Sequence, residues 1–81
     1  MKPPSDVIAR QLGDSAVLIR MRTSRIYELN TTGARIWELL SQGASRESAV
    51  EALLAEFHIE RPEAEAAVDE LVGSLRSEGL L

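Results

Sequence analysis

The sequence predicts one α+β domain, in which a three-stranded antiparallel sheet is followed by three helices. Up to Asn30, short apolar runs alternate with turn residues, whereas apolar residues after Asn30 recur at helical spacing. The stretches between the expected strands are short, which favours antiparallel hairpins. A chain of 81 residues suits one domain, whose small core should bury about 60–65% of the unfolded surface.

Three strands are expected before the first helix. Residues 7–12 form the weakest candidate, and Gly13 with Asp14 signals a turn after it. Residues 16–21 include four consecutive apolar residues, which is typical of a central strand. Residues 25–29 form the third strand and run directly into the first helix.

The third expected strand lies at the end of the sheet. Alternation places Tyr27 and Leu29 on one face and Ile26 and Glu28 on the other. A strand at the end of a sheet presents unpaired N–H and C=O groups, which can pair with another chain. The outer edge of this strand is therefore a candidate binding site, with the N-terminal segment as an alternative occupant.

Each of the three helices has a start signal and an apolar stripe. Asn30 or Thr31 caps the first helix, Ser45 caps the second, and Pro62 takes the first helical position of the third. A glycine follows the first and the third helix. The two final leucines are expected to fold back as an apolar plug. The stripes comprise Ile36, Trp37 and Leu40; Val50, Leu53, Leu54 and Phe57; and Ala64, Val68, Leu71 and Leu75.

Composition excludes several classes of protein. The absence of cysteine rules out disulfides and thiolate metal sites. No apolar run approaches the roughly 18 residues of a membrane span, and no signal-peptide core follows the N-terminus, so we expect a cytoplasmic protein. Residues 1–5 contain two prolines and are expected to be flexible.

The net charge of −4 is unevenly distributed. Residues 1–35 carry six basic and three acidic side chains, whereas residues 36–81 carry three basic and ten acidic ones. Solvated faces of surface helices are the simplest explanation of the acidic half. The alternative is that the basic strand region attracts an acidic partner.

The sequence provides no basis for an enzyme. His58 is the only histidine, and a single histidine before a helix break is typical of a structural or exposed position. The carboxylates of Glu63, Glu65, Asp69 and Glu70 are explained by the helix dipole and by solvation rather than by a metal. No phosphate-cradling glycine loop is present. We therefore expect no catalytic residue, no metal and no cofactor.

A winged-helix DNA-binding protein is an alternative, because three helices and a hairpin fit that architecture. Arg20 and Arg22 would then contact phosphates, since phosphate binding depends on basic side chains. However, the third helix region carries five carboxylates between Glu63 and Glu78 against Arg76, which argues against a recognition helix. A purely structural interaction domain is a further alternative.

A peptide-binding module fits the pattern better. A peptide that adds a strand to a free edge gains backbone hydrogen bonds, and neighbouring pockets give specificity. On a helical wheel, Val72 lies about 40° to one side of the core stripe, next to Asp69 and Arg76. Val72 either widens the core or floors, with Val68, a groove rimmed by Asp69 and Arg76. If the third helix packs beside the third strand, groove and edge form one site.

The segment from Ile26 to Leu40, IYELNTTGARIWELL, resembles the strand-to-helix signature of PqqD-like proteins. The Ser45 cap, the valines and leucines of the third helix and the ending from Glu78 to Leu81 agree with it. The resemblance covers nearly the whole chain, more weakly before Val17. It implies a winged-helix-like fold without catalytic residues. It also implies a recognition element for the leader segments of ribosomally synthesised, post-translationally modified peptides (RiPPs).

The resemblance further implies how a leader segment binds. It adds as an antiparallel strand to the third strand, beside the third helix, and the protein presents the precursor to a processing enzyme. In lasso-peptide biosynthesis, which we favour, that enzyme is a leader protease; in pyrroloquinoline quinone biosynthesis, the alternative, it is a radical-SAM enzyme. The chain ends directly after two leucines, so we expect a stand-alone element. Carried over by position, the peptide-binding residues are Arg25, Ile26, Tyr27, Glu28, Leu29, Val68, Asp69, Val72 and Arg76, with Tyr27 and Trp37 mainly in the core.

Overall fold

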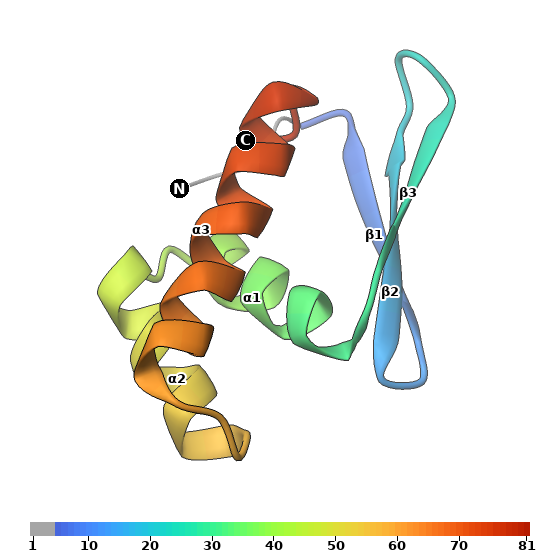
Figure 1. Ribbon diagram of the computed structural model, residues 1–81. Helices are drawn as coiled ribbons and strands as arrows, with labels where there is room; N and C mark the ends of the chain where they lie inside the picture. The colour runs from blue at the N-terminus through green and yellow to red at the C-terminus, as the bar shows by residue number, and fades with distance from the viewer. Residues whose placement is uncertain (1–4) are drawn as a thin grey trace.

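The computed structural model describes residues 5–81 and confirms the predicted order of three strands and three helices (Figure 1). The sheet lies on one side of the molecule and the helices on the other. The flexibility expected for residues 1–5 lies outside the described residues, apart from Ser5, which is in a turn. The elements are β1 (Val7–Leu12), β2 (Ser15–Arg20), β3 (Arg25–Leu29), α1 (Thr31–Ser41), α2 (Arg46–Glu56) and α3 (Arg61–Ser77).

The sheet is antiparallel, with β2 between β1 and β3. A two-residue loop joins β1 to β2, and Gly13 occupies its first position with a φ of 63°, which glycine adopts without steric cost. The loop before β3 contains Ser24, whose φ is 57°. Short hairpin loops thus fix the register of all three strands.

The register also determines which backbone groups of β3 are unpaired. The Met21 N–H donates to the Asp6 carbonyl (2.8 Å), so the odd-numbered residues of β2 direct their backbone groups toward β1. The even-numbered residues of β2 therefore bond to β3, where the register sets them opposite odd-numbered residues. As a result, the N–H and C=O groups of Ile26 and Glu28 point away from β2.

α1 is the central element of the fold. Its backbone lies against β2 and β3 and also against α2 and α3. Two core clusters meet at this helix, and Leu71 and Leu81 pack against both. The sheet-side cluster contains Ala16, Leu18, Leu29, Ala34, Trp37, Leu75 and Leu80. The helix-side cluster contains Ile36, Leu40, Ala49, Val50, Leu53, Ala64 and Val68.

Arg20 fastens the end of α3 to the sheet. Its guanidinium donates to the carbonyls of Glu78 (3.0 Å) and Gly79 (2.8 Å) and to the carboxylate of Asp6 (3.4 Å). Gly79 has a φ of 73°, and a Cβ at this position would lie 2.5 Å from an Arg20 nitrogen. Glycine therefore permits both the backbone turn and the contact. Leu80 follows and is buried, which confirms the predicted apolar plug for this residue.

Two of the three predicted helix starts are confirmed. The side chains of Asn30 and Ser45 each accept a hydrogen bond from the amide three residues further on, at 2.8 and 3.1 Å. The prediction that Pro62 takes the first position of the third helix is wrong by one residue, because α3 begins at Arg61. Proline fits the second position because the amides of the first turn have no partner within the helix.

Candidate peptide-binding groove

Within residues 5–81 the outer edge of β3 is open, and the N-terminal segment expected as an alternative occupant lies in part outside the described residues. Among residues 5–81, β2 is the only strand that pairs with β3, so the outward backbone groups of Ile26 and Glu28 have no ladder partner. Both side chains are exposed, and 65% of Ile26 is accessible to solvent. Tyr27 and Leu29 instead pack in the sheet-side cluster. The predicted alternation of this strand is therefore confirmed.

A groove of about 410 Å³ begins where β3 ends and runs between α1 and α3. Four of its residues come from the β3–α1 junction and α1, and four come from α3. The α3 residues follow the spacing i, i+3, i+4, i+7 and so form one helix face. Because Asn30 directly follows β3, the groove begins at the C-terminal end of this strand. The lining residues are Asn30, Thr32, Gly33, Ile36, Ala67, Glu70, Leu71 and Ser74.

The groove combines an apolar floor with a polar rim. Ile36 is buried, whereas Ala67 and Leu71 are half-buried and keep part of their surface accessible. The rim carries amide and hydroxyl groups and one charged side chain, Glu70, which forms no ion pair with any side chain in the described residues. Apolar walls with a few placed polar groups are typical of ligand sites.

The other end of β3 is bridged to the end of α3 by Arg25. Its guanidinium lies 3.6 Å from the Glu78 carboxylate and 5.4 Å from the centroid of the Tyr27 ring. Both partners of the ion pair are exposed, so the pair adds little to stability. It nevertheless neutralises Arg25 locally, which leaves the two ends of β3 with different electrostatic surroundings.

The helix residues predicted for the site lie away from this groove. Val68 is fully buried in the helix-side cluster, so its side chain presents no surface to this groove. Val72 is half-buried and packs against the same cluster. Asp69 binds Arg46 of α2, and Arg76 is exposed in the last turn of α3. None of these four residues lines the groove.

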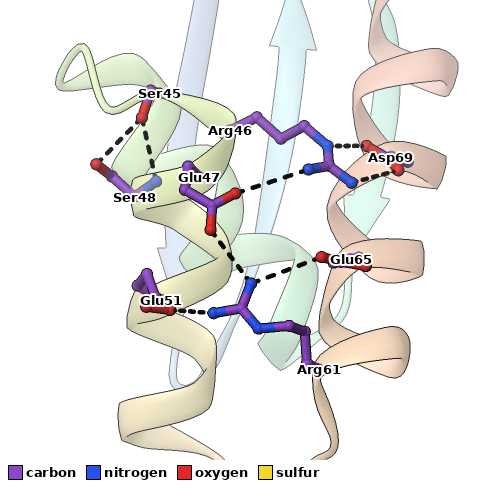
Figure 2. A network of polar contacts seen from close by, with 8 residues as sticks. All are labelled: Ser45, Arg46, Glu47, Ser48, Glu51, Arg61, Glu65 and Asp69. Carbon is purple, nitrogen blue, oxygen red and sulfur yellow. Dashed lines mark hydrogen bonds and ion pairs between the residues drawn. The ribbon is translucent and has the colours of Figure 1, made fainter.

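Ion pairs join α2 to the border of α3 that carries Asp69 (Figure 2). Arg46 donates to both carboxylate oxygens of Asp69, at 2.6 and 2.9 Å, and this hydrogen bonding lowers the pKa of Asp69. Arg61 approaches three carboxylates of the two helices, those of Glu47, Glu51 and Glu65. This border of α3 is thus occupied by the protein's own side chains.

The two arginines that the DNA-binding alternative needs have different surroundings, because Arg20 is half-buried and Arg22 is exposed. Arg20 binds the end of α3, and Arg22 lies 3.8 Å from Asp6. In the described part of the chain, no group of three or more His, Asp or Glu side chains is arranged to hold a metal ion. None of the helices in residues 5–81 combines the length and apolar character that crossing a bilayer requires.

Two solved structures are similar to this chain over nearly its full length. One is described as TbiB1 in complex with the TbiA(beta) leader peptide; it is 32% identical, has a TM-score of 0.91, and the match covers 100% of this chain and 94% of that chain. The other is described as lasso peptide synthetase B1 complexed with the leader peptide; it is 29% identical, has a TM-score of 0.87, and the match covers 98% and 93%.

A comparison with curated proteins gives no match. A family model described as coenzyme PQQ synthesis protein D (PqqD) matches residues 15–81, which extend from the start of β2 to the last residue. The matched region contains β3, α1 and α3, the three elements that build the edge and the groove. The chain therefore belongs to the PqqD family.

Proposed function

We propose that this protein binds the leader segment of a lasso-peptide precursor and presents it to a processing enzyme in the cytoplasm. The leader adds to β3 as an antiparallel strand and places side chains in the groove between α1 and α3. The protein itself contributes binding and no catalysis. The observation that supports the proposal is an edge at Ile26 and Glu28 that is unpaired within residues 5–81, on a strand whose C-terminal end leads into that groove.

The energetics of edge pairing support a combined site. Ile26 and Glu28 offer four outward backbone groups, each contributing about 0.5–1.5 kcal/mol net when bonded. That sum of about 2–6 kcal/mol is offset by the ordering of a flexible peptide. Backbone pairing alone therefore does not give useful affinity, and apolar leader side chains in the groove must supply the remainder.

The comparisons favour lasso-peptide biosynthesis over the quinone pathway. Both similar solved structures are described with a leader peptide, and one is named a lasso peptide synthetase. The processing enzyme that we propose is accordingly a leader protease. In the alternative, a radical-SAM enzyme of pyrroloquinoline quinone biosynthesis takes its place, which the family description accommodates.

The test is a titration of isotope-labelled protein with the leader peptide of the precursor encoded beside this gene. We expect amide shifts along β3 and at the groove residues of α3, and little change at α2. Ile26→Pro removes an outward N–H without breaking the ladder to β2, and we expect it to weaken binding about 2- to 10-fold.

Two controls make the test specific. Ile26→Ala shortens the side chain but keeps the N–H, so the difference from Ile26→Pro isolates the backbone bond. Ala9→Pro removes an outward N–H from the opposite edge of the sheet, on β1, and should leave affinity unchanged. Absence of binding, or equal losses for Ile26→Pro and Ala9→Pro, would contradict pairing at β3.

A further inference from the structure

The solvent-facing side of the open edge has a defined order of side chains. Glu28, near the groove end of β3, comes first, and Ile26, nearer the start of the strand, comes second. The side chains of both residues face solvent, and their N–H and C=O groups point away from β2. We infer that β3 selects leaders with a basic residue two positions before an aliphatic one. This inference rests on the proposed function, since it applies to a leader bound as an antiparallel strand.

The register follows from sheet geometry. An antiparallel strand on β3 runs from the Leu29 end toward the Arg25 end, so the leader residue opposite Glu28 precedes the residue opposite Ile26 by two. Both leader side chains lie on the solvent face, because side chains directly opposite each other share one face of a sheet. The leader residue between them points toward the groove side.

The aliphatic preference comes from a row of isoleucines across the sheet. Ile8, Ile19 and Ile26 are direct cross-strand neighbours on the solvent face. Ile26 ends the row and is 65% exposed, whereas Ile8 at the other end is 36% exposed. A β-branched or other aliphatic residue opposite Ile26 extends this row to a fourth strand and covers the exposed side chain.

The basic preference comes from the carboxylate of Glu28 near the groove end of β3. Glu28 lies on the solvent face of the sheet with Ile26 and lines a hollow that also includes Asn30. Its carboxylate forms no ion pair within residues 5–81. A lysine or arginine opposite Glu28 therefore gains a cross-strand charge pair.

The start of β3 gives an internal contrast. Arg25 is also charged, but Glu78 at 3.6 Å already balances it. We therefore expect no comparable charge preference at the leader residue opposite Arg25, three positions after the basic one. The selected leader pattern is thus a basic residue, any residue and an aliphatic residue, followed by a position without a charge preference.

The experiment is selection of a randomised peptide library against the wild type, Glu28→Lys and Glu60→Lys. Glu60 precedes α3, makes no side-chain cap bond and lies outside the groove lining. Glu60→Lys is therefore the control, because it makes the same change of charge as Glu28→Lys at a position outside β3. We expect wild type and Glu60→Lys to enrich the basic–any–aliphatic pattern. Glu28→Lys should enrich an acidic residue in place of the basic one and retain the aliphatic one.

The affinities of selected synthetic peptides are then measured in a double-mutant cycle, which combines a substitution in the peptide with one in the protein. Exchanging lysine for glutamate in the peptide should weaken binding to wild type about threefold to fivefold, and Glu28→Lys should restore it. Equal enrichment by all three proteins, or no rescue, would overturn the inference while leaving leader binding intact. If neither the neighbouring leader nor any library peptide binds through β3, the proposed function itself is wrong.

Discussion

The two borders of α3 have opposite roles in this molecule. The border facing α2 is closed. Arg46 forms a bidentate ion pair with Asp69 there, and the neighbouring residue Val68 is fully buried. The border facing the β3–α1 junction is open, with Ala67 half-buried and Glu70 without an ion pair in residues 5–81. One helix thus holds the fold together with one border and leaves the other available.

Substitutions at the two borders should therefore have different effects, on stability at one and on binding at the other. Side chains at the closed border have partners within the protein, so altering them changes the free energy of unfolding. Side chains at the open border have few partners, so altering them changes what can be bound. Each of the following substitutions tests that separation.

The largest effect is expected for Val68→Asp at the closed border. Burying an unpaired carboxylate costs several kcal/mol, which is comparable with the about 4–12 kcal/mol of stability expected for a domain of this size. We expect the variant to be largely unfolded by circular dichroism and thermal melting. Ala66→Asp introduces the same side chain at an exposed α3 position and should remain folded. A folded Val68→Asp protein would show that this border is not closed.

The next effect is expected for Ala67→Phe at the open border. A phenyl ring there fills the groove, so we expect leader affinity to fall at least about tenfold, whereas the free energy of unfolding should change by less than about 1.5 kcal/mol. Ala66→Phe is the matched control, because Ala66 is adjacent in sequence, exposed and outside the groove lining. Isothermal titration with the leader peptide measures the difference, and equal losses for both variants would argue against binding in the groove.

The smallest effect is expected for Asp69→Asn, and it depends on pH. The hydrogen bonds from Arg46 lower the pKa of Asp69 below the ordinary value of 3.8. A carboxylate whose pKa is lower in the folded state stabilises the protein above pH 4 and loses that contribution as pH falls through the lowered value. As pH is lowered from 7 to 2, the free energy of unfolding measured with urea should therefore fall less steeply for Asp69→Asn than for the wild type. Leader affinity at pH 7 should be unchanged, and a loss there would place Asp69 in the binding site after all.

The sequence predicts most of this fold because its signals are local. Gly13 marks the first hairpin, the alternation of residues 25–29 identifies both faces of β3, and the caps at Asn30 and Ser45 mark helix starts. The free edge of β3 follows from its place at the end of a three-stranded sheet. These features depend on neighbours in the chain, so a single sequence is sufficient.

The groove face of α3 could not be predicted in the same way. On the helical wheel, Val72 and Ala67 lie on opposite sides of the core stripe, and both are apolar. Which side faces α2 is decided by contacts distant in sequence, such as Arg46 with Asp69. Leu71 illustrates the same difficulty, because it belongs to the predicted core stripe and yet lines the groove.

The order of residues on β3 also bears on aggregation. An exposed strand edge invites pairing with the same edge of another copy, and outward residues must then face outward residues. The register with full overlap sets Ile26 of each copy against Glu28 of the other, which pairs an aliphatic side chain with a carboxylate. Registers that match Ile26 with Ile26, or Glu28 with Glu28, shorten the overlap, and the second also opposes like charges. The same two residues that favour a suitable guest therefore make β3 a poor partner for itself, so concentrated protein without peptide should stay monomeric.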